Sequence, residues 1–134
     1  MAEFVLRQLR DYRSALPLAQ AAVTLNPWYS AWLWVVLGDT LYALDRFEEA
    51  HEAYVQARRI DEQDPRTCLS LAYSYHQLGR LPEALEAIAQ AFAHDPQGVF
   101  RDRLLEKQQH LIAAVEGKWR SEQEWLNRRA GRLR

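Results

Sequence analysis

The hydrophobic and polar positions of this chain repeat along its length. The stretch from Ser30 to Ile60 places small and large apolar residues at helical spacing, and most have a counterpart of the same kind 34 residues later. The paired positions are Leu37/Leu71, Gly38/Ala72, Leu41/Tyr75, Asp45/Gly79, Ala50/Ala84, Tyr54/Ile88, Ala57/Ala91 and Ile60/His94, of which only the last changes character. A fixed period of this length indicates stacked helix-turn-helix units.

This pattern predicts an all-α protein with about seven helices in antiparallel pairs, the arrangement called an α-solenoid. Residues 1–98 hold the repeats, and residues 99–134 hold a last helix with a basic tail. The predicted repeats are a partial one over 2–27 and two full ones over 30–64 and 65–97. Short turns between the helices suit such an array.

The partial repeat is predicted to start with a shortened helix over residues 2–9. Arg10-Asp11-Tyr12 then stands where Asp45-Arg46-Phe47 forms a turn in the next repeat, so we expect a turn there. A second helix should begin at about Ser14, which keeps Pro17 near the first turn, where proline is tolerated. A chain that begins inside a repeat is expected to be a piece of a larger protein.

The last helix, at about 99–129, combines an apolar stripe with an opposite polar face. A terminal helix of this kind is expected to cap the repeats, because an end repeat otherwise exposes its core. The stripe consists of Leu104, Leu105, Gln108, Leu111, Ile112, Val115, Trp119 and Leu126. The polar face carries Arg101, Lys107, Glu116 and Arg120.

Charge adds an asymmetry to this picture. Residues 1–98 hold 8 Arg and 13 Asp or Glu, a net charge of −5, whereas residues 99–134 hold 9 Arg or Lys and 5 Asp or Glu, a net charge of +4. No apolar run is long enough for a membrane span, and the start does not resemble a secretory signal, so we expect a cytoplasmic protein. The single cysteine, Cys68, excludes a disulfide within the chain and is predicted to be a small buried residue.

The repeated motif resembles that of the tetratricopeptide repeat family, W-x2-L-G-x2-Y…A-x3-F…A…P, in a bacterial-type domain. In the first full repeat it reads Trp34-x2-Leu37-Gly38-x2-Leu41…Ala50-x3-Tyr54…Ala57, without the expected proline. In the second it reads Cys68-x2-Leu71-Ala72-x2-Tyr75…Ala84-x3-Ile88…Ala91…Pro96. The resemblance covers about residues 2–98 and implies a right-handed superhelix that serves as an adaptor or regulatory scaffold binding a protein or peptide.

In proteins of this family the first helix of each repeat lines a concave groove. Carried over by position, the groove residues are Trp32, Val35, Asp39 and Tyr42 from one repeat and Arg66, Leu69, Tyr73, His76 and Gln77 from the next. Aromatic rings with a few polar groups suit an extended or helical peptide. Val35 and Asp39 stand where a carboxylate clamp needs cationic and amide groups, so that clamp is not expected. An alternative is that the last helix itself fills the groove.

Other activities have less support in the sequence. The histidines show no metal-ligand spacing, there is no glycine-rich phosphate loop, and the carboxylates follow helical charge patterns, so we expect no enzyme, metal or cofactor. Self-association through the N-terminal repeat edge, with exposed Trp28 and Tyr29, and through the C-terminal helix is the main alternative. A minor alternative is nucleic-acid contact by the basic tail, Arg128-Arg129-x2-Arg132-x-Arg134.

Overall fold

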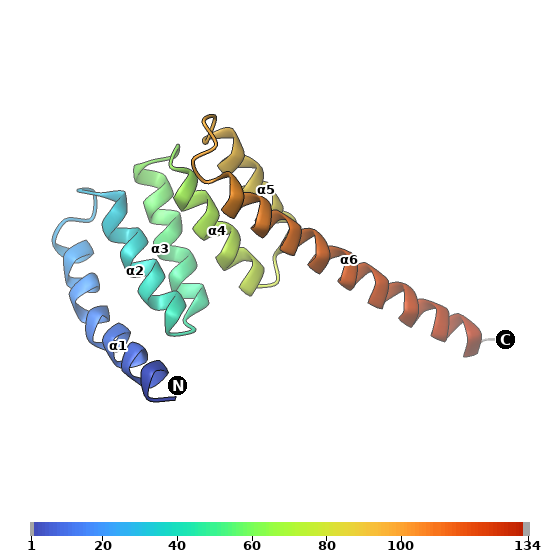
Figure 1. Ribbon diagram of the computed structural model, residues 1–134. Coiled ribbons are helices and arrows are strands. Elements are labelled where there is room, and N and C mark those ends of the chain that lie inside the picture. The colour runs from blue at the N-terminus through green and yellow to red at the C-terminus, as the bar shows by residue number, and fades with distance from the viewer. Residues whose placement is uncertain (1, 133–134) are drawn as a thin grey trace.

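The computed structural model describes residues 2–132, with side chains from residue 11 onward. Its six helices are α1 (Ala2–Leu25), α2 (Ala31–Ala43), α3 (Phe47–Ile60), α4 (Pro65–Gln77), α5 (Leu81–Ala93) and α6 (Arg101–Arg132). Consecutive helices run antiparallel and stack side by side, with α1 at one end and α6 at the other (Figure 1). The all-α solenoid is therefore confirmed for the described residues, with six helices in place of about seven.

Small residues mark the places where the stacked helices meet. Ala50, Ala72 and Ala84 are 0% exposed, and Gly38 is buried as well. Large side chains fill the space between these close contacts, among them Leu71, Ile88, Leu104 and Leu111. Each such side chain stabilises the fold by roughly 1.5–3 kcal/mol when it is buried. The buried residues form one cluster that joins the repeats into a continuous core.

The hairpins within the two full repeats turn at residues with positive φ. Asp45 has a φ of 61° and Gly79 a φ of 75°. This left-handed conformation is open to glycine and is tolerated by aspartate better than by most residues. Both turns therefore use the same repeat position, and both use a residue type that accepts the required backbone.

The predicted turn in the partial repeat is wrong. Helix α1 continues from Ala2 to Leu25 through Arg10-Asp11-Tyr12, with Pro17 inside it. Arg10 stands at the position of the two positive-φ residues, and a long side chain disfavours that backbone conformation. The chain therefore stays helical, although Pro17 removes one amide donor. The two helices predicted on either side of this turn, the second from Ser14, are one.

Helix α6 caps the core only along its first turns. Leu104 and Leu111 are fully buried where α5 packs against it. Beyond them α6 projects away from the stack (Figure 1), and the rest of the predicted stripe, from Ile112 to Leu126, is exposed at its large apolar residues. The expected capping role therefore applies to one part of the helix. None of the described helices is long and apolar enough to cross a membrane.

Gly38 packs against the ring of Tyr54. A Cβ atom added at Gly38 would lie 2.7 Å from Tyr54 Cδ1 and 3.0 Å from Cζ, closer than carbon atoms normally approach. The ring is held in place because its hydroxyl donates a 2.6 Å hydrogen bond to Asp39 Oδ1. The second full repeat has Ala72 and Ile88 at the equivalent positions, so a larger residue on one helix is matched by a smaller one on the other.

We predict that Gly38→Ala destabilises the domain by about 1–3 kcal/mol, because overlap with the Tyr54 ring outweighs the helix propensity of alanine. In a Tyr54→Ile background, which copies the second repeat, the same substitution should cost little. Urea denaturation followed by circular dichroism measures both effects. Gly117→Ala is the control, since the space around that helical glycine is open. A stabilising effect of Gly38→Ala in the unaltered background would contradict the tight contact.

Candidate functional site

One face of the stack is formed by α2, α4 and the start of α6, which lie side by side in Figure 1. The nine groove residues predicted from the sequence come from α2 and α4 and form two groups along this face. The first group, from the N-terminal and middle parts of the two helices, is Trp32, Val35, Asp39, Arg66 and Leu69, and the second, toward their C-terminal ends, is Tyr42, Tyr73, His76 and Gln77. We call this whole face the groove.

The first group lines a hollow between α2 and α4. All five of its residues contribute to the wall of this hollow, which has a volume of about 490 Å³. Trp32 is 58% exposed, whereas Val35 and Leu69 are buried and form part of the apolar wall. Phe100 and Arg103 also line the hollow. The repeat pattern did not predict these two because they follow the last recognised repeat.

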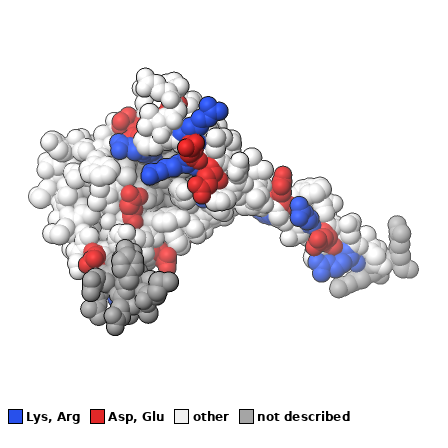
Figure 2. Space-filling view, in the orientation of Figure 1, with Lys and Arg blue, Asp and Glu red and all other residues white. Residues whose placement is uncertain are grey.

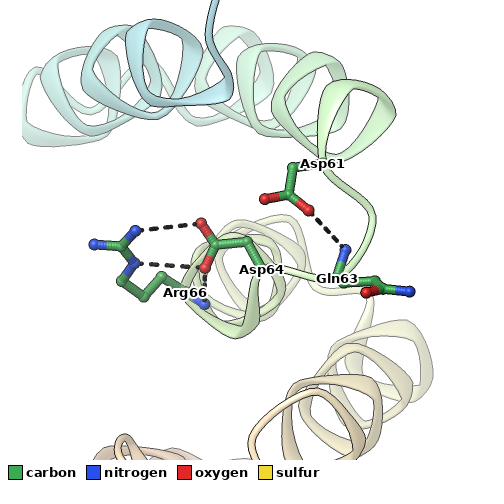
Figure 3. A network of polar contacts seen from close by, with 4 residues as sticks. All are labelled: Asp61, Gln63, Asp64 and Arg66. Atoms are coloured by element: carbon green, nitrogen blue, oxygen red, sulfur yellow. Dashed lines mark hydrogen bonds and ion pairs between the residues drawn. The ribbon is translucent and has the colours of Figure 1, made fainter.

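The loop between α3 and α4 holds the polar rim of the hollow in place (Figure 3). Asp61 Oδ1 accepts a 3.1 Å hydrogen bond from the Gln63 amide. Asp64 caps α4 by accepting a 2.9 Å hydrogen bond from the Arg66 amide, and the same carboxylate pairs with the Arg66 guanidinium at 3.4 Å. The guanidinium carbon lies 5.9 Å from the Trp32 ring centroid. The loop therefore positions a cation beside the exposed indole.

Asp39 connects the hollow to the core. Its side chain is a hydrogen-bond acceptor for the buried Tyr54 hydroxyl. Partial burial raises the pKa of the Asp39 carboxyl, and the hydrogen bond from Tyr54 opposes this shift. Burial, followed by the bond to Asp39, strongly raises the pKa of Tyr54. Asp39 thus has a structural role in holding the Tyr54 ring, in addition to its place in the wall of the hollow.

The second group forms an aromatic cluster. Gln77 Nε2 donates a 3.2 Å hydrogen bond to the Tyr42 hydroxyl, which ties α4 to α2. The rings of Tyr42 and Tyr73 meet edge to face with their centroids 6.4 Å apart. The Tyr42 ring also meets the Phe47 ring edge to face, with the two ring centroids 5.0 Å apart. Tyr73 keeps 40% of its surface exposed, so the cluster presents an open aromatic surface next to the hollow.

Lys107 of α6 completes this cluster, which corrects the expectation that it lies on the polar face of the last helix. It is only 4% exposed. Its ammonium group donates a 2.8 Å hydrogen bond to His76 Nδ1 and lies 4.1 Å from the Tyr73 ring centroid. Lys107 has the same helical face as Leu104 and Leu111, three residues before it and four after it, and this spacing was the available signal for its burial.

No carboxylate in the described part of the chain forms an ion pair with Lys107. Burial lowers the pKa of the Lys107 ammonium group. The pKa of His76 is lowered by burial first, and then by the nearby charges of Lys107 and His110. Because lysine only donates, His76 accepts through Nδ1 and carries its proton on Nε2 at neutral pH. The groove therefore contains a buried cation held by a neutral histidine and an aromatic ring.

Cys68 of α4 is buried and only 1% exposed, as predicted. Burial raises the pKa of its thiol, which keeps the thiol protonated and weakly reactive. The chemistry of the groove is therefore that of a contact surface with apolar walls, aromatic rings and a few fixed charges.

The structure resembles several solved helical proteins. The translocator chaperone SycD of Yersinia enterocolitica superimposes with a TM-score of 0.72 at 21% sequence identity, covering 85% of this chain and 82% of SycD. PcrH, solved with the chaperone-binding region of PopD, gives 0.68 at 23% identity, covering 88% of this chain and 96% of PcrH. The tetratricopeptide domain of Arabidopsis OM64 superimposes with a TM-score of 0.67 at 20% sequence identity, covering 76% of this chain and 81% of the OM64 domain.

A comparison of the sequence with curated proteins gave no significant match. The family model described as "Tetratricopeptide repeat" matches twice, over residues 6–66 and 41–102, and so includes both full repeats and both groove helices. Together with the stacked helix pairs and the small residues at their contacts, this match shows that the chain belongs to the tetratricopeptide repeat family.

Proposed function

We propose that this domain is a scaffold that binds a peptide segment of a protein partner in the groove of α2, α4 and the start of α6. The observation that carries the proposal is the hollow of about 490 Å³ between α2 and α4, lined by five of the predicted groove residues. Trp32 in the wall of this hollow and Tyr73 in the aromatic cluster keep 58% and 40% of their surfaces exposed. Exposed aromatic side chains beside an apolar hollow are typical of protein contact surfaces.

The course of α6 supports an open groove. Its first turns border the groove, where Phe100 and Arg103 line the hollow and Lys107 contacts His76. The helix then runs away from the stack (Figure 1). Trp32 and Tyr73 would be covered if α6 occupied the groove, so their exposed surface favours an external ligand over the last helix as the occupant.

Structural relatives give indirect support. PcrH was solved with chaperone-binding regions of PopD and of PopB, and SycD with a peptide of the translocator YopD. These complexes concern those proteins, and at 20–24% identity the similarity to this chain concerns the fold. They do show that helical stacks of this kind accommodate peptide segments. We propose binding without catalysis for this domain, and a cytoplasmic location stays a prediction.

The groove also indicates the kind of peptide it accepts. Trp32, Val35, Leu69 and Phe100 offer apolar surface for one large apolar or aromatic side chain, which gains by leaving water. The charged groups of Arg103, Asp61 and Asp64 also line the hollow. They favour binding of peptides that place complementary polar groups at a matching spacing. We therefore expect a peptide with an apolar anchor between polar residues.

Selection of a phage-displayed random peptide library on the full chain tests this proposal. The selected peptides should bind the chain, and Trp32→Ala with Tyr73→Ala should weaken the binding by about 10- to 100-fold, the range expected for aromatic hot spots. Fluorescence polarisation of a labelled peptide measures the affinity.

Trp119→Ala is the matched control, since Trp119 is 63% exposed but lies outside the groove. It should leave the affinity unchanged. Selected peptides that bind the Trp32→Ala/Tyr73→Ala variant as tightly as the unaltered chain would refute the groove as the binding site.

Lys107 also supports a binding role for the groove, because it is a poor choice for stability alone. A buried ammonium group loses its hydration, and a neutral histidine and a ring replace that hydration only in part. The lowered pKa of Lys107 has the same origin. A methionine of similar length would fill the space without this penalty. We infer that the ammonium group is retained for a role other than stability, either contact with a bound ligand or positioning of the groove side chains around it.

We predict that Lys107→Met raises the melting temperature at pH 7, because it removes the desolvation cost of the charge. The pKa of Lys107 is lowered in the folded state from 10.5, so the unaltered chain recovers stability as pH rises toward 10.5 and the advantage of the variant shrinks there. Differential scanning calorimetry across this pH range measures the effect. Lys118→Met, at an exposed lysine, should change little.

Acid provides a second test of the same contact. The pKa of His76 lies below its unfolded value of 6.5, so its contribution to stability is complete above pH 6.5 and declines as the pH falls below that value. Without the Lys107 charge this decline should be smaller in Lys107→Met. A lower melting temperature for the variant at pH 7 would mean that the contacts with His76 and Tyr73 outweigh the cost of burial.

A further inference from the structure

The contact between His76 of α4 and Lys107 of α6 depends on the protonation state of the histidine. Lys107 Nζ donates its 2.8 Å hydrogen bond to His76 Nδ1, and the ammonium group lies 4.1 Å from the Tyr73 ring centroid. A neutral imidazole has one ring nitrogen that accepts such a bond, whereas both nitrogens of the protonated ring are donors. The contact therefore exists only while His76 is neutral.

The charge of Lys107 relies on these two groups. Lys107 is 4% exposed, and no carboxylate in the described part of the chain forms an ion pair with it. Along the projecting part of α6, by contrast, charged side chains of both signs follow one another in solvent (Figure 2). Those charges are hydrated, whereas Lys107 has His76 and Tyr73 in place of water. A change at His76 therefore acts directly on a buried charge.

The charged groups that act on His76 come from α6. Burial is the main cause of the lowered pKa of His76, and the charges of Lys107 and His110 lower it further. Other groups on the surrounding helices act elsewhere: Glu106 and Arg103 of α6 on Tyr73, Arg80 and Glu83 at the start of α5 on His51 of α3, and Gln77 on the Tyr42 hydroxyl of α2. Among the described residues, no carboxylate forms an ion pair with His76 that would hold a proton there.

Protonation of His76 breaks the contact with Lys107. Nδ1 then carries a hydrogen and faces the ammonium group at 2.8 Å, and two positive charges this close repel each other strongly where water is excluded. The flexible side chain of lysine lets the ammonium group move to solvent without unfolding of the helix. In the described part of the chain this bond is the only hydrogen bond between α4 and α6, which otherwise packs on α5. Its loss therefore frees the start of α6 from α4.

We propose that His76 and Lys107 form an acid-sensitive latch between α4 and α6, in which protonation of His76 releases Lys107 from the groove and weakens peptide binding. The effect on binding rests on the proposed function of the groove. Release of Lys107 removes the cation beside Tyr73, an exposed aromatic residue of the groove. It also frees the start of α6, where Phe100 and Arg103 line the hollow. Because the pKa of His76 lies below 6.5, the latch opens below that pH.

Nuclear magnetic resonance of the lysine side chains tests the latch directly, because Lys107 and Lys118 are the two lysines of the chain. The chain is labelled with isotopes at lysine alone. At pH 7 the ε-methylene signal of Lys107 should lie upfield of the Lys118 signal, since the Tyr73 ring shields it. As the pH falls to about 4.5, through the range in which histidine titrates, the Lys107 signal should move to the position of the Lys118 signal. Exposed Lys118 is the internal reference.

His76→Gln is the matched variant, because the side-chain oxygen of glutamine accepts a hydrogen bond at every pH. In this variant the Lys107 signal should stay upfield over the whole range. His110→Gln is the control for the second histidine near the latch, and its Lys107 signal should titrate like that of the unaltered chain. Circular dichroism at each pH separates release of Lys107 from unfolding.

Peptide binding tests the consequence for the groove. A selected groove peptide without Asp, Glu or His is used, so that the ligand itself does not titrate in this range. Its affinity for the unaltered chain should fall by about 10-fold or more between pH 7 and pH 4.5, whereas its affinity for His76→Gln should change much less. Fluorescence polarisation measures both.

The latch is refuted if the Lys107 signal stays upfield down to the lowest pH, moves equally in His76→Gln, or moves only when the chain unfolds. Control of binding is refuted if the signal moves while the peptide affinity stays constant. A chain that binds no peptide at pH 7 contradicts the proposed function of the groove instead, and the lysine signals still decide whether the latch exists.

Discussion

Close contact between helices at glycine and alanine positions holds this protein together. Ala50, Ala72 and Ala84 have no exposed surface, and Gly38 leaves room for the ring of Tyr54. Larger residues at these positions would push neighbouring helices apart, and large side chains such as Leu71 would lose the close packing on which their contribution depends. Because each repeat contacts only its neighbours, the loss of one such contact weakens the whole stack.

The same contacts position the groove. The Tyr54 ring packs on Gly38 inside the stack, and its hydroxyl binds Asp39, which lines the hollow. Helix α4 is tied to α2 by the bond from Gln77 to Tyr42. The spacing of α2 and α4, and with it the width of the hollow, therefore follows from packing in the core. A peptide bound in the proposed groove would meet a surface that is already formed, which limits the ordering cost of binding.

The two ends of the stack differ from its middle. An α-solenoid buries the faces of its inner helices but leaves one face of each end helix without a partner. At the α1 end this leaves Leu18 and Leu25 in solvent, and at the α6 end it leaves Trp119 and Leu126 there. The early turns of α6 are different again, because they border the groove and bring Lys107 to His76. One helix thus supplies a wall of the groove and an uncovered surface.

The sequence alone determined the repeated hairpins, the small residues at their contacts and the helices that line the groove, because a period of 34 residues records the same local packing twice. Alignment of the repeats predicted a turn at Arg10-Asp11-Tyr12, but the structure has a continuous helix there. The turns of the full repeats need a residue that accepts positive φ, and Arg10 is a poorer choice for that conformation than Asp45 or Gly79. Only the tertiary structure decided that Lys107 is buried against His76 and that the stripe of α6 is covered as far as Leu111. A helical pattern reports which residues share a face, whereas burial depends on which distant part of the chain lies against that face.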